Sequence, residues 1–258
     1  MPTFAAKVNS VDLASIDVIV HHADGPWSFP AASYEELQIP GRPGATRSST
    51  VATIGARDLT LSCSAQAATP EALSAIVDSL DALVTGDVTI TMGHTPTRRW
   101  SGATFAGSLD GVGRDPQFVN GKVAADFELK FRLLDPYAED ITATTVSGAA
   151  ATPITCPLGT RASLPVITLT GATNPVVTVK GPLGDTRGTF TLSGTGDFEI
   201  DCDAIGITLG GVDTPDAMTD GDFVELACQS GEYTAGTFPT IETTSGAISV
   251  TYRKKWAH

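Results

Sequence analysis

The residues of this sequence that could support acid–base or metal chemistry are few. Histidine occurs four times in 258 residues, and only His21 and His22, followed by Asp24, form a cluster. Imidazole and carboxylate groups together make general acid–base pairs and metal sites. Because either kind of site needs a further partner and none lies nearby in the sequence, we interpret this cluster as the solvated end of a strand.

A second set of candidate ligands is a series of aspartates in the C-terminal half. Its members are Asp197, Asp201, Asp203, Asp213, Asp216, Asp220 and Asp222. Carboxylate oxygens are ligands of Ca²⁺, but the series lacks the spacing of a D-x-[DN]-x-[DN]-G loop. Its members lie at or near turns, where aspartate hydrogen-bonds to nearby backbone. We therefore expect turn residues here rather than a calcium site.

Aromatic residues offer a third chemistry, stacking against sugars. The candidates are Trp27, Phe29, Tyr233, Phe238 and Trp256. Aromatic side chains of a β-sandwich are more often used for core or edge packing. Sugar binding therefore stays an alternative function.

The four cysteines, Cys63, Cys156, Cys202 and Cys228, contain no C-x-x-C pair. Metal sites favour closely spaced ligands, and disulfide frameworks are typical of short secreted chains. We expect buried thiols, since free cysteine is among the most buried residue types. A Cys202–Cys228 bridge is compatible with the spacing, which does not require it.

Motifs of catalysis are absent from the sequence. It contains no G-x-S-x-G elbow, P-loop, G-x-G-x-x-G after a strand, or H-E-x-x-H. Paired carboxylates for glycoside hydrolysis stay open, because their separation is a three-dimensional quantity. We predict that the chain is not an enzyme and has no catalytic, cofactor or metal site.

The composition excludes several other classes. The 16 basic and 29 acidic residues give a net charge of −13, which disfavours binding to nucleic-acid phosphates. With 41% hydrophobic and 17% charged residues the chain can bury a core. No apolar run reaches the roughly 18 residues needed to cross a bilayer, so we expect no membrane insertion. No charged leader precedes an apolar stretch, so we expect no signal peptide.

One helix is predicted, beginning after Thr69, with Pro70 in its first turn, and ending at Gly86. Its apolar residues form a single stripe, namely Leu73, Ile76, Val77, Leu80 and Val84. Alternating strands flank it, over residues 59–63 and 88–92. This pattern indicates an amphipathic helix packed on a sheet.

The clearest strand is predicted from Lys122 to Leu133, where apolar and polar residues alternate strictly. Such a strand has one buried and one polar face, and Pro136 ends it. We interpret residues 95–117 as a long glycine-rich loop that could form a hairpin with a protruding tip. Loops of that length are usually functional or disordered.

The C-terminal part is predicted to be an antiparallel β-sandwich. Residues 141–153, rich in Thr, Ala, Ser and Gly, are a candidate linker or edge segment. Short alternating strands and glycine turns then follow to the end of the chain. We predict a mainly β fold with two domains, residues 1–140 and residues 141–258.

The order of these features resembles the distal tail protein (Dit) family of long non-contractile bacteriophage tails. The segments that carry the resemblance are VIV at 18–20, IPGRPG at 39–44, the helix from Thr69, FRLLDPYA at 131–138, TNP at 173–175, GTGDFEIDC at 194–202 and ISVTYR at 248–253. Each is common alone, and the specificity lies in their order along almost the whole chain.

The resemblance implies a structural virion protein. Its first domain would form a hexameric ring at the junction of tail tube and tip hub, with a channel for DNA, and its second would be a galectin-like sandwich. Implied partners are the chain itself, the tail tube protein and the tip hub, with receptor-binding proteins or host glycans as further candidates. Implied ring contacts are the turn at 39–44, the strand Lys122–Leu133 and the loop 95–117. The protein would assemble in bacterial cytoplasm and reside at the tail tip. The alternative is a non-catalytic carbohydrate-binding β-sandwich module.

Overall fold

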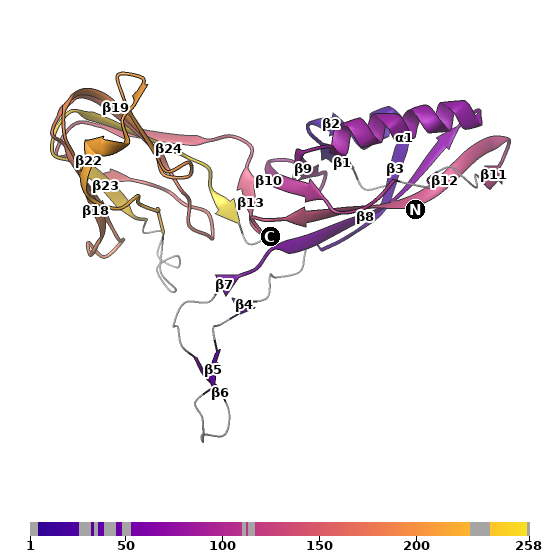
Figure 1. The fold of residues 1–258 in the computed structure, drawn as a ribbon, viewed down its shortest axis with the longest axis horizontal. Coiled ribbons are helices and arrows are strands. Elements are labelled where there is room, and N and C mark those ends of the chain that lie inside the picture. The colour runs from indigo at the N-terminus through magenta and orange to yellow at the C-terminus, as the bar shows by residue number, and fades with distance from the viewer. Residues whose placement is uncertain are drawn as a thin grey trace. The chain divides into compact units, whose positions relative to one another are not determined.

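The structure, a computed structural model, describes residues 5–25, 32–33, 36–38, 45–47, 53–109, 112, 117–227 and 238–256. Two compact units make up the chain. Unit 1 contains residues 1–138 with 257–258, and unit 2 contains residues 139–256. The described residues form a mainly β structure with one α-helix (Figure 1), as the sequence predicts.

Unit 1 is built on one antiparallel sheet with a helix. Its elements are β1 (Ala6–Val8), β2 (Val11–Asp12), the 3₁₀ helix η1 (Leu13–Ile16), β3 (Val18–Asp24), β4 (Ala32–Ser33), β5 (Glu36–Gln38), β6 (Ala45–Arg47), β7 (Thr53–Ile54), β8 (Arg57–Ala67), α1 (Pro70–Val84), β9 (Asp87–Met92), β10 (Arg98–Phe105), β11 (Gln117–Val119) and β12 (Lys122–Leu133). The main sheet has the order β2-β1-β9-β10-β12-β8-β3, with β11 added on β12. In the part of the chain that connects β3 to β8, β4 pairs with β7 and β5 pairs with β6.

Helix α1 has the sequence-predicted limits. The Thr69 hydroxyl accepts a hydrogen bond from the Ala72 N–H at 3.2 Å, which satisfies one of the free donors of the first turn. The helix lies along one face of the sheet (Figure 1), and its buried residues are Leu73, Leu80 and Val84. No helix in the described part of the chain is long and apolar enough to span a bilayer.

The long strand predicted from alternation is confirmed. Strand β12 pairs with β8 in one unbroken antiparallel register, from Val123 opposite Ala67 to Leu133 opposite Arg57. Val123, Leu129, Phe131 and Leu133 are buried with α1 in the core of unit 1. The alternation therefore sets which face of β12 meets the helix.

The interpretation of residues 95–117 as a loop is wrong over part of its length, because Arg98–Phe105 forms β10 inside the sheet. Trp100 and Ala103 are buried, and the register with β9 shifts between them. Gly102, between the two, has φ +64°. A bulge of this kind changes the phase of the in–out alternation, so the strand lacks the period-two pattern by which strands are recognised.

Unit 2 is an antiparallel β-sandwich, as predicted. After β13 (Ala138–Asp140), at the boundary, its elements are β14 (Thr144–Gly148), β15 (Ile154–Thr155), β16 (Val166–Thr173), β17 (Val176–Lys180), β18 (Thr186–Leu192), β19 (Thr195–Asp201), β20 (Gly206–Leu209), β21 (Val212–Asp213), the 3₁₀ helix η2 (Pro215–Ala217), β22 (Met218–Gly221), β23 (Thr240–Thr243), β24 (Ala247–Tyr252) and β25 (Lys255–Trp256). One sheet has the order β14-β24-β16-β19-β20-β21 and the other β15-β23-β17-β18-β22. The segment 141–153 contains the edge strand β14, so its edge interpretation is confirmed over those residues.

Candidate assembly surface

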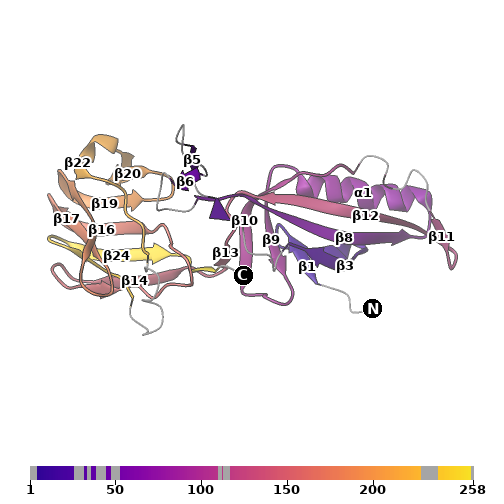
Figure 2. The same ribbon diagram turned by 90° about the horizontal axis from the view of Figure 1, so that it is seen from below.

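The sheet of unit 1 has one face covered by α1 and one polar face, which we call the open face. Figure 2 views the sheet from the side opposite the helix. Residues opposite each other in register share a face, and three cross-strand rows define the open face. The rows are His22–Ser62–Glu128, Asp24–Thr60–Lys130 and Asp58–Arg132–Thr104–Asp87.

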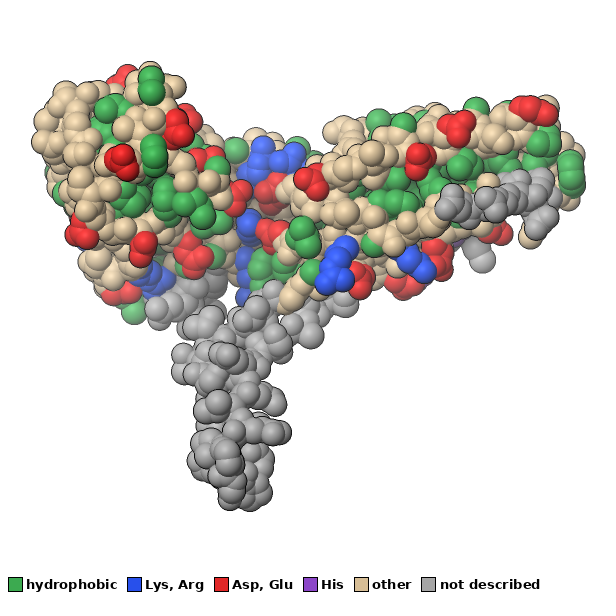
Figure 3. Space-filling model, in the orientation of Figure 1, with side chains coloured by type: hydrophobic (Ala, Val, Ile, Leu, Met, Phe, Trp, Pro, Cys, Tyr) green, Lys and Arg blue, Asp and Glu red, His purple; other side chains and the backbone are tan. Residues whose placement is uncertain are grey.

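The open face carries charges of both signs. By register its carboxylates come from Asp12, Asp24, Asp58, Asp87, Asp126 and Glu128, and its basic side chains from Lys7, Lys122, Lys130 and Arg132. Lys130 Nζ lies 2.9 Å from Glu128 Oε2, and both side chains are about half exposed. Figure 3 shows charged side chains gathered along the side of the sheet away from α1. Exposed ion pairs of this kind add little stability. A contribution to the stability of unit 1 therefore does not explain why the open face carries so many charged residues.

A groove lies beside the middle of β12. Strand β10 pairs with β12 from Phe131 onward and β11 pairs with it up to Ala124. Between these contacts the segment after β10 approaches β12, where the Ala106 N–H donates to the Lys130 carbonyl at 2.8 Å. The groove, of about 640 Å³, is lined by Ala106, Gly107, Ser108, Val112, Asp126, Phe127, Glu128 and Lys130. Two segments predicted to make ring contacts, β12 and part of 95–117, thus meet at one place.

The hairpin formed by β11 and β12 has exposed apolar residues near its tip. Phe118 of β11 is 76% exposed and Val119 is 45% exposed. The turn residues Asn120 and Gly121 both have positive φ, at 51° and 74°, as a type I′ hairpin turn requires. Our sequence analysis missed this hairpin, although an Asn-Gly pair before an alternating strand is its usual signal.

The histidine cluster has the surroundings expected of a strand end. His22 Nε2 lies 2.8 Å from Asp24 Oδ1, and the two side chains are 60% and 71% exposed. His21 Nε2 is 2.7 Å from Ser64 Oγ on the neighbouring strand. The described residues contain no group of three His, Cys, Asp or Glu side chains that could hold a metal ion.

Several aspartates of unit 2 act in turns, as predicted. Asp201 Oδ1 accepts hydrogen bonds from the N–H groups of Asp203 and Ala204, each at 2.9 Å. Asp197 Oδ1 accepts from the Gly171 N–H at 2.8 Å. These bonds use the carboxylates to fold the backbone locally.

The aromatic candidates that are described take part in packing. Phe238 packs against the core of unit 2, and Trp256 Nε1 donates to Asp140 Oδ1 at 2.7 Å. Trp27, Phe29 and Tyr233 lie outside the described residues, as do the turn at 39–44, Cys228 and residues 113–116. Neither described aromatic supplies evidence for sugar stacking.

Three thiols are buried and free, namely Cys63, Cys156 and Cys202. Burial raises the pKa of Cys63 and Cys156 to about 12 and that of Cys202 to about 11, from an ordinary value of 9.0. A buried neutral thiol is a poor nucleophile. The prediction of buried thiols is therefore confirmed for these three, and Cys202 is not in a disulfide.

We expect these thiols to react with N-ethylmaleimide at least about 100-fold more slowly in native protein than in guanidinium, because attack needs an exposed thiolate. Because folding raises their pKa, the stability that these groups contribute is complete below pH 9 and is lost as the pH rises towards 11–12. Peptide mass spectrometry of labelled protein and denaturation at increasing pH test both statements. Equal labelling of Cys63 in native and denatured protein would contradict the first.

Comparison with solved structures identifies this architecture. The crystal structure of Dit (gp 19.1) from phage SPP1 superposes with a TM-score of 0.74 at 20% sequence identity, covering 98% of this chain and 99% of that chain. The chain has the fold of SPP1 Dit. The resemblance drawn from the sequence is thereby confirmed at the level of the fold.

The other comparisons are weaker. Two structures of the phage p2 baseplate in its activated conformation, with Sr and with Ca, match at TM-scores of 0.48 and identities of 9% and 8%. Each match covers 98% of this chain and 97% of the other. No protein-family model and no curated protein matches the sequence.

Proposed function

We propose that this chain is a structural protein of a phage tail tip, a distal tail protein that joins the tail tube to the tip hub. The observation that carries the proposal is the fold shared with SPP1 Dit over 98% of this chain and 99% of that one. That protein is described as a paradigm of the hub adsorption apparatus of phages that infect Gram-positive bacteria. The role proposed here is non-enzymatic and located at the virion tail tip.

In this proposal six copies form a ring through the domain of residues 1–140, and a central channel lets DNA pass. The domain of residues 141–258 is the galectin-like sandwich. Partners are the tail tube protein and the tip hub, with receptor-binding proteins or host glycans as candidates for the second domain. The supporting features are in unit 1, which has a polar open face and an exposed hydrophobic hairpin tip at Phe118. A closed ring needs two different surfaces that meet between neighbours.

Negative-stain imaging together with the solution mass tests the ring. Hexamers are expected as six-fold particles with an open centre and about six times the 26.6 kDa mass of one chain. If the purified chain is monomeric, the same measurement is repeated with the tube and hub proteins added, because assembly can need a template. Failure to form rings or to join either partner would contradict the proposal.

Phe118→Asp is expected to abolish ring assembly. Burying an exposed phenylalanine at a subunit contact contributes about 1.5–3 kcal/mol, and a closed hexamer loses this at each of its contacts. The thermal midpoint of the monomer should change little, because Phe118 is 76% exposed. Size-exclusion chromatography with light scattering measures the change.

The matched control is Leu183→Asp in unit 2. Leu183 is 84% exposed, so this variant adds the same charge at an equally exposed apolar position outside the proposed ring domain. It should form rings like the unmodified chain. Equal assembly by both variants would remove the β11–β12 hairpin tip from the subunit contact.

A further inference from the structure

Unit 2 has a groove near one edge of its sandwich. It is lined by Ile205, Ile207, Pro215, Met218, Thr219, Asp220, Gly221 and Phe223, and its volume is about 520 Å³. Its walls come from the start of β20, from η2 and from β22, the last strand of the five-stranded sheet. A volume of this size accommodates one or two large side chains.

The groove is lined mostly by apolar residues, and one of them is held in an unusual conformation. Ile207 is buried, whereas Ile205 is 70% exposed. Ile205 has φ +56°, a region that β-branched residues rarely adopt. Glycine or asparagine would be easier to accommodate at this position. Folding of the turn therefore does not explain an isoleucine here, and outliers of this kind are often functional.

The chain segments that line the groove are acidic. Residues 188–252 contain eleven aspartates and glutamates and no lysine or arginine, and the nearest preceding basic residue is Arg187, whose Nη1 donates to the Ala227 carbonyl at 2.6 Å. Asp220 lines the groove, Asp216 and Asp222 are next to lining residues in sequence, and all three are exposed. Figure 3 shows apolar and acidic side chains interspersed over unit 2. An apolar groove with such a rim has complementary charge for a cationic ligand.

The strand beside the groove has a free edge among the described strands. Strand β22 pairs with β18, from Phe190 opposite Gly221 to Leu192 opposite Met218, and with no other described strand. An edge strand offers unpaired backbone donors and acceptors to an added chain segment. An extended peptide is thus the ligand shape that suits this site.

We propose that this groove binds an extended segment of another protein in which apolar side chains are flanked by lysine or arginine. The apolar side chains would enter between Ile205, Met218 and Phe223, and the basic side chains would face Asp220 and Asp222. The inference does not rest on the proposed ring, because it concerns the surface of a single chain and is tested on unassembled protein. Six-fold rings can form whether or not the groove binds such a segment.

Methyl-labelled methionine offers a selective probe of the groove. The sequence has three methionines, of which Met218 lines the groove and Met92 is buried in unit 1. The probe is the synthetic peptide acetyl-Lys-Lys-Leu-Phe-Lys-Lys-amide, titrated into [¹³C-methyl]methionine-labelled protein. The Met218 methyl resonance should shift saturably while that of Met92 stays in place. Raising the NaCl concentration from about 50 mM to about 500 mM should weaken binding, because screening reduces attraction between exposed charges.

Variant peptides and protein variants distinguish the contribution of charge to binding from the contribution of apolar contacts. The peptides with Glu for Lys, or with Gly-Gly for Leu-Phe, should bind at least about fivefold more weakly. The double variant Asp220→Asn, Asp222→Asn should also lose about fivefold or more in affinity. The double variant Asp78→Asn, Asp81→Asn removes the same charge from exposed positions on α1 and should bind normally. Ile205→Gly suits the backbone of the turn, so it should fold normally and still bind at least about fivefold more weakly.

Several results would overturn the inference. They are the absence of a saturable Met218 shift, equal binding by the Asp220/Asp222 variant and the unmodified chain, and a Met218 shift that depends only on protein concentration, which would indicate a second copy. A shift caused by a chitin oligosaccharide and not by the basic peptide would make the groove a sugar site instead.

Discussion

Phe131→Ala is expected to lower the free energy of unfolding of unit 1 by about 3–5 kcal/mol. Phe131 is 1% exposed and lies opposite Leu59 in the register of β12 and β8. Its ring packs edge to face on Phe105, with the ring centroids 5.7 Å apart. The substitution removes this aromatic contact and leaves a cavity between the sheet and α1. Urea denaturation followed by circular dichroism measures the loss.

Phe118→Ala is the matched control, because it truncates the same side chain in the same unit at a position that is 76% exposed. Its effect should stay within about 0.5 kcal/mol. The two units can unfold in separate transitions, so the transition that shifts has to be assigned to unit 1. A loss below about 1 kcal/mol for Phe131→Ala would contradict the packing of unit 1 described above.

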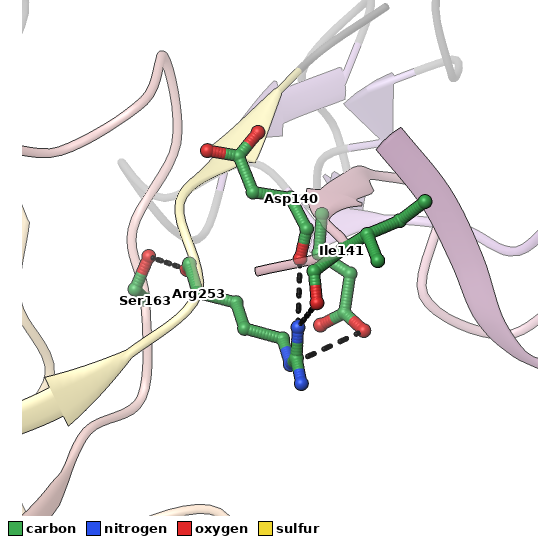
Figure 4. A network of polar contacts seen from close by, with 5 residues as sticks. Asp140, Ile141, Ser163 and Arg253 are labelled. Atoms are coloured by element: carbon green, nitrogen blue, oxygen red, sulfur yellow. Dashed lines mark hydrogen bonds and ion pairs between the residues drawn. The ribbon is translucent and has the colours of Figure 1, made fainter. Parts of the chain in front are cut away.

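Arg253→Met is expected to destabilise unit 2 by about 2–3 kcal/mol. Figure 4 shows the network that this arginine forms. Its Nη1 donates to the carbonyl of Asp140 at 2.9 Å and also to that of Ile141, and its Nε lies 4.0 Å from Glu139 Oε1. Its own carbonyl accepts from Ser163 Oγ at 2.7 Å. The side chain therefore links the first residues of unit 2 to the segment that directly follows β24, its last long strand.

Two variants distinguish the effect of the positive charge at position 253 from the effect of the planar guanidinium group. Arg253→Lys keeps the charge but not the planar fork of donors, so it should recover less than half of the loss. Glu139→Gln should cost less than about 1 kcal/mol, because a partly exposed ion pair at this distance is weak. Thermal denaturation of all three variants gives the comparison. If the lysine variant matches the unmodified chain, a single positive charge suffices and the fork is unnecessary.

Local patterns in the sequence predicted those helices and strands whose own residues show a clear periodicity or a capping residue. The period of the apolar residues and the Thr69 cap gave the limits of α1, and strict alternation gave those of β12. Strand β10 was missed because a bulge at Gly102 breaks the alternation between Trp100 and Ala103. The Asn120-Gly121 hairpin carried a usable signal, and its exposed Phe118 is the apolar contact that we propose for assembly.

The sequence by itself determined the mainly β class, the amphipathic helix and the sandwich, because each follows from residues close together in the chain. Only the tertiary structure decided which strands share the open face and which residues line the two grooves. Arg253 contacts the carbonyl of Asp140, 113 residues away, and no local pattern encodes that distance. Such contacts depend on strand order and register, which long-range packing selects after local structure is set.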